Sequence, residues 1–492
     1  MVHVSIDATV FHWGSVRIQV FGPSDSAAIT KAVKAAFAQN GGHDPANHGQ
    51  FSSARFAFMF KPGTYDASVE VPVGFYTSIY GLGAAPGDVV FTSEKGVYCE
   101  EGDFNYTGGA LDNFWRSAEN FKTEATWAVT GGKGMLWAVS QASPLRRVHA
   151  TGDLVLFEYE PPYQGAGYSS GGFLANAVVN GTVYPGSQQQ WFTRSARVGQ
   201  WSGGVWNMVF AGVDGAPPSH CGNFGNAPPI TAVPTAPLVS DKPFVVYDGA
   251  TGKYALAVPP VRADSAGPDF APVSGDALVG FEHVYVARPG DSAATINGAL
   301  AQGLHVVLSP AIYDLEAPLV LGTPGQVLLG LGMATLRAAK GTAAVRVAAG
   351  AAGARVAGVI VQAGPAGNAP PASLVVWGEP GGKTGSPVNI LPSSKLRLLL
   401  SHDYCITAVR MYSLIFASAS CPGRDRRRAS CRTCLCASAA PTARRPTRSP
   451  PRTWSRSTRT TSSATTCGSG APTTRAAAAR RPRTTRWGPA SS

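Results

Sequence analysis

The sequence predicts an all-β fold: a right-handed parallel β-helix in two tandem copies, with the second copy truncated. Three observations support this. A block near the N-terminus recurs near residue 290, many short segments with alternating apolar residues follow the first block, and the chain has 57 Gly and 38 Pro but only 14% charged residues. Such a composition favours short strands and turns over long helices. An antiparallel sandwich is the alternative architecture.

The repeated block marks the start of each copy. "GPSDSAAITKAVKAAF" (22–37) is echoed by "RPGDSAATINGALAQG" (288–303), and "FKPGTYDASVEVPVGFYTSIYGLG" (60–83) is echoed by "LSPAIYDLEAPLVLGTPGQVLLGLG" (308–332). In each copy an Asp-Ser pair precedes a helical pattern and strand patterns follow, which is typical of a repeat architecture.

Four residues of the block have an expected local role. We expect Asp25 and Asp291 to be the N-caps of the two helices, because Asp accepts hydrogen bonds from backbone N–H groups of the first turn. We expect Gly83 and Gly332 to occupy turns in which the backbone takes a positive φ.

Short strand patterns continue after the first block. Each alternates apolar and polar residues before a turn. One turn of such a coil cannot bury its apolar face alone, so stacked turns bury it against one another. The patterns lie at 113–123, 136–152, 171–186, 188–201 and 205–215.

These patterns divide the chain into four predicted parts. Residues 1–245 form the first β-helix with its helical cap, and they end in an aperiodic, Pro-rich linker. Residues 246–280 hold a linker and a small hairpin. Residues 281–378 begin the second, truncated β-helix, and 379–492 form an aberrant, disordered tail.

Charge separates the tail from the rest. The net charge is +12, but residues 421–492 hold 16 Arg, no Lys and one acid, a net charge of +15, so the remainder carries −3. Arg without Lys or interleaved aromatic residues is a poor basis for recognising nucleic acid, so we expect no specific nucleic-acid partner. No apolar run is long enough to cross a membrane, and the N-terminus shows no signal peptide.

The strand segments carry a resemblance to a known family. Five of them, and one short segment beyond, resemble the bacterial laminarinase branch of glycoside hydrolase family 55, and the likeness runs from about residue 20 to about residue 375. The six segments are "NFWRSAEN" (113–120), "WAVSQASPLRRVHATGDL" (137–154), "SSGGFLAN" (169–176), "GSQQQWFTRS" (186–195), "VWNMVFAGVDGAP" (205–217) and "DKPF" (241–244).

The resemblance implies a fold and an activity. It implies two pectate-lyase-like solenoids side by side, with an active site in the cleft between them. It implies cleavage of β-1,3-glucan from the chain end with inversion, by a monomer, without a cofactor, outside the cell or in the cell wall. Inverting hydrolysis needs a general acid and an activated water on the opposite face of the sugar.

The resemblance also points to site residues in the first copy. Those that match its polar motifs, and are candidates to position the water, are Gln141, Ser170, Gln188, Gln190 and Ser195. Alternatively, Gln188 and Gln190 share a strand face and form an amide ladder. The tryptophans that are candidates to stack on sugar rings, or else belong to the core, are Trp115, Trp191 and Trp206.

Other charged residues of the body have structural expectations. Arg146 and Arg147 either line the cleft or pair with acids, and we favour pairing. Glu119 lies within a strand motif, and Asp66 and Asp314 lie in the repeated turn, so none of the three is expected to replace a general acid.

The family pattern fades after residue 378. When "RASCRTCLCASAAP" (428–441) is translated from the third base of each codon, it can give "GVLQDVFVRVGGP", a string expected in the family. We therefore predict that residues from about 423 onward are translated in the wrong frame, which sequencing the transcript tests. Cys431, Cys434 and Cys436, spaced like a zinc knuckle, are then a by-product and no metal site.

Two functions follow from the sequence. The intact gene product is expected to be an inverting exo-β-1,3-glucanase, and the chain itself is expected to be inactive, because the segment with the general-acid Glu is missing. The alternative is a β-glucan-binding solenoid without hydrolysis. A third option, a polyuronate lyase, would need clustered Asp residues to bind calcium. The body of the chain has no such acidic cluster. Because the truncated copy ends in an open edge, we expect only residues 15–260, roughly, to resist proteolysis.

Overall fold

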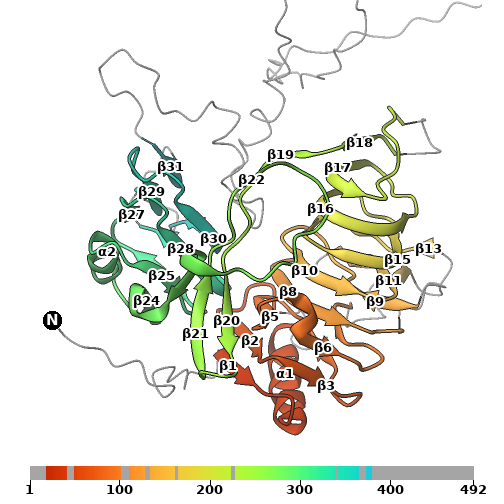
Figure 1. Ribbon diagram of the computed structural model, residues 1–492, viewed down its shortest axis with the longest axis horizontal. Coiled ribbons are helices and arrows are strands. Elements are labelled where there is room, and N and C mark those ends of the chain that lie inside the picture. The colour runs from red at the N-terminus through yellow and green to blue at the C-terminus, as the bar shows by residue number, and fades with distance from the viewer. Residues whose placement is uncertain are drawn as a thin grey trace, which may run out of the picture. The chain divides into compact units, whose positions relative to one another are not determined.

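The computed structural model consists mostly of strands (Figure 1), so the predicted all-β fold class is confirmed. All the described residues belong to one compact unit, Met1–Ala417. The tail at 379–492, with its cysteine cluster and the predicted frame change, lies outside the described residues. The described residues are 18–41, 49–100, 110–111, 113–127, 133–160, 165–222, 228–339, 341–364 and 373–378.

A sheet of parallel strands makes up the first part of the structure, residues 18–233, here called the first stack. Its strands follow the order β1, β2, β5, β8, β10, β14, β16, β17 and β18, and each pairs in parallel with the next. Parallel neighbours require the chain to return to the starting end of each strand. Successive strands therefore lie one above the next along the stack.

The elements of the first stack are short. They are β1 Ile18–Phe21, α1 Ser26–Asn40, β2 Phe56–Phe60, β3 Gly63–Tyr65, β4 Val71–Pro72, β5 Thr77–Gly81, η1 Pro86–Asp88, β6 Val89–Phe91, β7 Val97–Tyr98, β8 Arg116–Thr123, β9 Gly134–Leu136, β10 Leu145–Ala150, β11 Asp153–Val155, β12 Tyr159–Glu160, β13 Gly165–Ala166, β14 Gly172–Ala175, β15 Val178–Tyr184, β16 Gln190–Trp201, β17 Asn207–Asp214 and β18 Ile230–Val233.

Strand β2, with the sequence FAFMF, shows how the core is built. All five residues are buried. Successive side chains of a strand point to opposite faces, so Phe56, Phe58 and Phe60 enter the interior of the first stack, while Ala57 and Met59 join a second apolar cluster on the outside. The strand lacks polar alternation because it is covered on both faces.

The two aspartates expected as N-caps have a different role. The Asp25 carboxylate accepts a hydrogen bond from the N–H of Gly22 at 2.7 Å, and makes no side-chain bond to the helix that follows. Asp291 likewise accepts from the N–H of Arg288 at 2.8 Å, and Ser292 is the N-cap of the second helix. The capping prediction is therefore wrong for Asp291. Asp25 does occupy the N-cap position, but its carboxylate closes the turn that precedes the helix and does not bond to the first turn.

The repeated Pro-x-x-Tyr-Asp motif has a clear structural reason. Tyr65 is buried, and its hydroxyl donates to the carbonyl of Phe21, the last residue of β1, at 3.0 Å. Tyr313 is its counterpart and donates to the carbonyl of Ala287 at 3.2 Å. In each copy the tyrosine thus ties the repeated turn to the end of the copy's first strand.

The segment between the two stacks contains more strands than expected. The predicted aperiodic linker at 217–244 includes β18, which joins the first stack, and β19. Strands β20 and β21 form an antiparallel hairpin that continues into β23. The elements are β19 Ala236–Val239, β20 Phe244–Asp248, β21 Lys253–Ala257, β22 Arg262–Ser265, η2 Gly275–Ala277, β23 Leu278–Gly280 and η3 Phe281–His283.

The second stack, residues 284–377, repeats the pattern of the first. One parallel sheet holds β24, β25, β26, β28 and β30, and another holds β27, β29 and β31. They enclose an apolar core of their own. The elements are β24 Val284–Ala287, α2 Ala293–Ala301, β25 His305–Leu308, β26 Ile312–Leu315, β27 Leu319–Leu321, β28 Val327–Ala338, β29 Val345–Val347, β30 Arg355–Ala363 and β31 Val375–Trp377.

The two stacks share a buried seam. An apolar cluster joins residues of β1, β2 and β5 to residues of β25, β28 and the hairpin. Two polar contacts cross it: the N–H of Gly332 donates to the Tyr80 hydroxyl at 2.9 Å, and the Arg55 guanidinium donates to Thr335 Oγ1 at 2.9 Å. Burial of apolar surface stabilises such contacts, so the seam fastens the stacks to each other.

One of the two turn glycines behaves as predicted. Gly332 has a φ of 55°, and a Cβ there would lie 2.7 Å from the carbonyl oxygen of Phe56. Gly83 is not among the described glycines with positive φ. It is needed for space instead, because its Cβ would lie 2.4 Å from the Cβ of Asp88.

Candidate functional site

A row of partly exposed side chains lies along the first stack, just before or at the start of its strands. The strand registers, counted back from the paired residues, align Gln141, Ser170, Gln189 and Trp206 on successive turns. Neighbouring strands lie about 4.8 Å apart, so the row is continuous. We call these four residues together with Gln190 the polar edge.

Hydrogen bonds order the centre of the polar edge. The amide Nε2 of Gln141 donates to Ser170 Oγ at 2.7 Å, and that hydroxyl faces Gln189 Oε1 at 3.4 Å. The N–H of Ser170 donates to Ser140 Oγ, a buried group, at 2.9 Å. A hydroxyl and amides offer both donors and acceptors, so this arrangement can hold and orient a water molecule or a sugar hydroxyl.

The structure brings several of the candidate residues together here. Gln141, Ser170, Gln190 and Trp206 all belong to the polar edge, and Trp206 is 51% exposed. Trp115 is half-buried, and the register aligns it with the residue after Gln141. It therefore lies beside the polar edge, one strand away from Gln141.

The other three candidates are buried. Gln188 is fully buried, and its amide donates to the carbonyls of Val139 and Leu156 at 2.6 and 2.7 Å. Trp191 is 2% exposed and belongs to the core, and Ser195 is buried. Side chains in this position do not contact a sugar at the surface. The side-chain amide of Gln188 forms no ladder with Gln190, because its N–H groups bond to the carbonyls of Val139 and Leu156.

A second polar group lies farther along the same strands, at Glu119, Arg146 and Arg194. The registers align Glu119 of β8, Arg146 of β10 and Arg194 of β16. Two residues of the segment between the stacks meet them: Lys242 Nζ lies 2.7 Å from Glu119 Oε1, and Arg194 Nη2 lies 2.7 Å from Asp241 Oδ1. All five are buried, so the polar edge and this charged group are separate.

The arginines of this group have structural partners. Arg147 Nε donates to Asn120 Oδ1 at 3.0 Å, and Nη1 donates to the carbonyl of Asp269 at 2.9 Å. The Arg146 guanidinium lies 4.5 Å from the centre of the Phe173 ring. Neither arginine is part of the polar edge.

Burial and charge act together on the ionisable groups here. Burial raises the pKa of Asp241, but the charge of Arg194 and its hydrogen bond, with the charges of Arg146 and Arg262, hold the pKa below its usual range. Burial lowers the pKa of Lys242, and the Glu119 carboxylate opposes that shift. The charge balance of this group therefore depends on its pairs.

The three acids that were not expected to replace a general acid all have partners within the fold. Glu119 pairs with Lys242. Asp66 accepts hydrogen bonds from Ser68 at the turn, and Asp314 forms a two-point ion pair with Arg337. Each has a partner within the fold, away from the polar edge.

Sequence reasoning missed two features of this region. Gln189 belongs to the polar edge, and the run "QQQ" was the available signal for it. The role of Asp241 had no local signal, because its partners Arg194 and Arg262 are 47 and 21 residues away in the chain.

The described part of the chain contains neither a metal-ion cluster nor a membrane-spanning helix. There, no three His, Cys, Asp or Glu side chains lie close enough to hold a metal ion. None of the described helices is both long and apolar enough to span a bilayer. Cys99 is a buried thiol and Cys221 an exposed one.

Known proteins resemble this chain in sequence and structure. The family model of the LAM55 pectate lyase-like domain matches residues 284–389. An exo-beta-1,3-glucanase of Streptomyces sp. (strain SirexAA-E / ActE) is 40% identical over 343 residues, which are 69% of this chain and 53% of that protein. The chain thus spans about half the length of this curated relative.

Solved structures agree with the sequence matches. The structure of sacteLam55A from Streptomyces sp. SirexAA-E matches with a TM-score of 0.65 and 38% identity, covering 76% of this chain and 62% of that one. A variant of sacteLam55A in complex with glucose matches with a TM-score of 0.64 and 38% identity, covering 75% and 61%. These matches support the similarity of this chain to glycoside hydrolase family 55.

Proposed function

We propose that the intact protein is an inverting exo-β-1,3-glucanase and that its polar edge holds the attacking water. The observation that supports this most is the exposed hydrogen bond between Gln141 and Ser170. It lies in a chain that is 40% identical to a named exo-beta-1,3-glucanase, and a related structure is a complex with glucose.

The chemistry of the polar edge suits a water-positioning role. Gln141 donates to Ser170 Oγ, and the serine hydroxyl hydrogen is directed toward Gln189. One lone pair of Ser170 is then left to accept a hydrogen bond from water, and the exposed amides supply donors. A water held in this way is placed to attack the anomeric carbon from the face opposite the leaving group, while a carboxylate base outside the polar edge takes its proton, as inversion requires.

We propose that the general acid is absent from the chain as printed. The polar edge contains amides, a hydroxyl and an indole but no carboxylate. Protonation of the leaving oxygen contributes about 10²–10⁴-fold to rate, so we propose that the chain as printed does not hydrolyse glucan.

Trp206 is the aromatic residue of the polar edge that we propose to stack on a sugar ring. It is 51% exposed and lies one strand beyond Gln189. An indole face packs well on the apolar face of a pyranose while its N–H stays available to a hydroxyl.

The finer features of the fold belong to the same proposal. We propose that each stack is a right-handed parallel β-helix, that the second is truncated, and that the protein acts as a monomer outside the cell or in the cell wall. The parallel registers along both stacks support the β-helix part.

Reducing-sugar release from laminarin tests the proposal. We expect no release from the chain as printed and glucose release from the product of the intact transcript. In that product, Gln141→Ala and Ser170→Ala are expected to lower kcat by about 10² or more. Gln200→Ala, an exposed glutamine of β16 away from the polar edge, is the control. Turnover by the printed chain contradicts the inactivity, and an unchanged rate in Gln141→Ala contradicts the role of the polar edge.

The second candidate is a β-glucan-binding solenoid without hydrolysis. The exposed Trp206 and the amides beside it favour this, because they can bind sugar without any acid. Calorimetry with laminari-oligosaccharides separates the two: binding without reducing-sugar release from the intact transcript product identifies a binder.

A further inference from the structure

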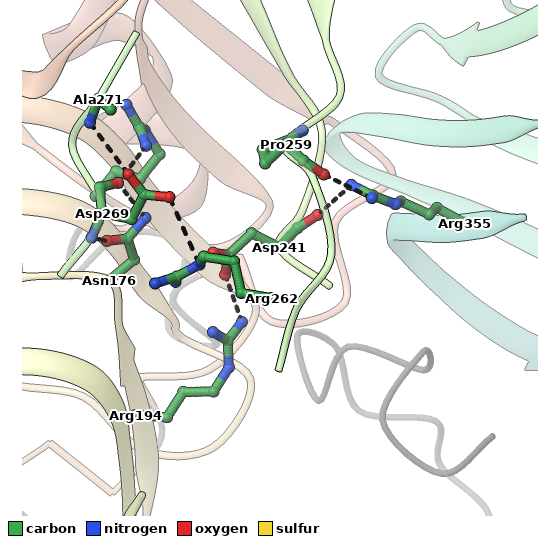
Figure 2. A network of polar contacts seen from close by, with 9 residues as sticks. Asn176, Arg194, Asp241, Pro259, Arg262, Asp269, Ala271 and Arg355 are labelled. Carbon is green, nitrogen blue, oxygen red and sulfur yellow. Dashed lines mark hydrogen bonds and ion pairs between the residues drawn. The ribbon is translucent and has the colours of Figure 1, made fainter. Parts of the chain in front are cut away.

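Asp241 makes contacts to three parts of the molecule. Its carboxylate lies 2.7 Å from Arg194 Nη2, on strand β16 of the first stack, and 3.3 Å from Arg262 Nη2, on β22. Its carbonyl oxygen accepts a hydrogen bond at 2.9 Å from Arg355 Nη1, on β30 of the second stack. Figure 2 shows Asp241 between these three arginines.

A fourth contact closes the network toward the second stack. The other terminal nitrogen of Arg355 donates to the carbonyl of Pro259 at 2.6 Å. Arg355 is thus held by two carbonyls of the segment between the stacks, as Figure 2 shows. A guanidinium presents its donors in a fixed plane, so the two bonds orient β30 as well as hold it.

The network lies in a buried environment. Asp241, Arg194 and Arg355 are 6%, 6% and 7% exposed. Ion pairs removed from water are screened little by salt. Removing one partner of such a pair leaves the other charge buried without compensation. Loss of the Asp241 carboxylate would leave the buried Arg194 in that state, whereas Arg262 also faces Asp269 Oδ2 at 3.5 Å.

The strand held by Asp241 also carries part of the polar edge. Gln190 begins β16 and Arg194 lies four residues farther along the same strand, about 13 Å away at about 3.3 Å per residue. The Asp241 contacts therefore join the strand that presents the polar edge to a strand of the second stack.

We propose that Asp241 is a positioning residue that holds the second stack in a fixed orientation relative to the polar edge, and so sets the geometry of glucan binding. The part about glucan rests on the proposed function. The part about orientation rests only on the contacts of Asp241. Asp241 itself does not touch the sugar.

Residue-resolved hydrogen exchange on the full chain tests the orientation. The N–H of Gly332 bonds across the seam to Tyr80, whereas the N–H of Leu82 bonds to Phe60 within the first stack. In Asp241→Asn we expect exchange at Gly332 to rise about tenfold or more and exchange at Leu82 to stay unchanged. Equal acceleration at both amides, or none at Gly332, overturns the proposal.

Two further variants keep the test decisive if Asp241→Asn folds poorly. Arg355→Gln removes the contact from the second stack and is expected to raise exchange at Gly332 in the same selective way. An unchanged Gly332 in that variant overturns the proposal. Asp214→Asn is the matched control, because Asp214 faces Arg197 at 3.5 Å in a largely exposed pair on the first stack. It is expected to leave Gly332 as in the unmodified chain.

Calorimetry with laminaritriose tests the consequence for the site. We expect Asp241→Asn to weaken binding about fivefold or more, although every residue of the polar edge is intact, and Asp241→Glu to restore part of it. Unchanged affinity overturns the link to the polar edge. If the unmodified chain binds no glucan, the proposed function fails, while the exchange at Gly332 still decides the orientation.

Discussion

Gln188 and Gln190 are two residues apart, yet one is buried and the other lies on the surface. In a continuous strand they would share a face. Strand β16 begins only at Gln190. Gln188 forms a separate parallel bridge with Ser169, and a bend at Gln189 interrupts the alternation between the two glutamines. The buried amide instead bonds to the carbonyls of Val139 and Leu156, which belong to other turns of the first stack.

Replacement of Gln188 measures this structural role. We expect Gln188→Ala to lower the free energy of unfolding by about 2–3 kcal/mol, because two buried carbonyls lose their donors. Gln190→Ala removes a half-exposed amide and is expected to change the free energy of unfolding by less than about 0.5 kcal/mol. Urea unfolding measures both. Equal losses in the two variants would contradict the buried role of Gln188.

The ionisation of Asp241 makes the free energy of unfolding depend on pH. The pKa of this carboxyl is below its usual range in the folded state, since the arginine charges outweigh the effect of burial. The unfolded value is about 3.9. The ionised group therefore stabilises the fold above about pH 4, and this contribution is lost as pH falls through the lower folded-state pKa.

Unfolding at several pH values tests this dependence. We expect the urea midpoint of the unmodified chain to fall between pH 5 and pH 3, and that of Asp241→Asn to fall less steeply from a lower starting value. If the two chains have the same slope over this range, Asp241 is not ionised in the fold as proposed.

At the scale of the element, helix α1 is attached to the first stack by its last residue. Asn40 is fully buried, and its amide donates to the carbonyls of Ala54 and Phe75 at 3.1 and 2.8 Å. The carbonyl of Asn40 accepts from the N–H of Phe75 in return. This side chain therefore attaches the helix to the stack beside apolar packing by residues such as Val33.

The contribution of this attachment is measurable. We expect Asn40→Ala to lower the free energy of unfolding by about 2 kcal/mol, because it leaves two buried carbonyls without a donor. Gln39→Ala, at the exposed neighbour, is the control and is expected to change it by less than about 0.5 kcal/mol. Chemical denaturation followed by circular dichroism compares them, and similar values for both would refute the attachment.

At the scale of the whole molecule, the seam determines whether the two stacks unfold separately or together. The sequence predicts that only residues 15–260, roughly, resist proteolysis. The structure instead shows that Leu329 and Leu331 of the second stack share a buried apolar cluster with Met59 and Tyr80 of the first. Because the cluster belongs to both stacks, we expect them to unfold together.

Hydrogen exchange at rising urea concentration tests concerted unfolding. We expect amides of β2 and those of β28 to lose protection at the same urea concentration. Leu329→Ala is expected to lower the free energy of unfolding by about 3 kcal/mol. Both strands should therefore lose protection at a lower urea concentration. Val320→Ala, at an exposed position of the second stack, should affect neither. If β28 loses protection well before β2, the first stack is the independent unit predicted from the sequence.

The sequence by itself determined the all-β class, the repeated opening of the two copies and most of the polar edge. The first two follow from local signals, namely apolar alternation, turn residues and a repeated motif such as Pro-x-x-Tyr-Asp, whereas the candidate residues of the polar edge came from the resemblance to a known family. Only the tertiary structure decided that Gln188, Trp191 and Ser195 are buried. It also decided that Asp241 joins β16 to the second stack. Such contacts depend on strand register and on residues far apart in the chain, which a local pattern does not specify.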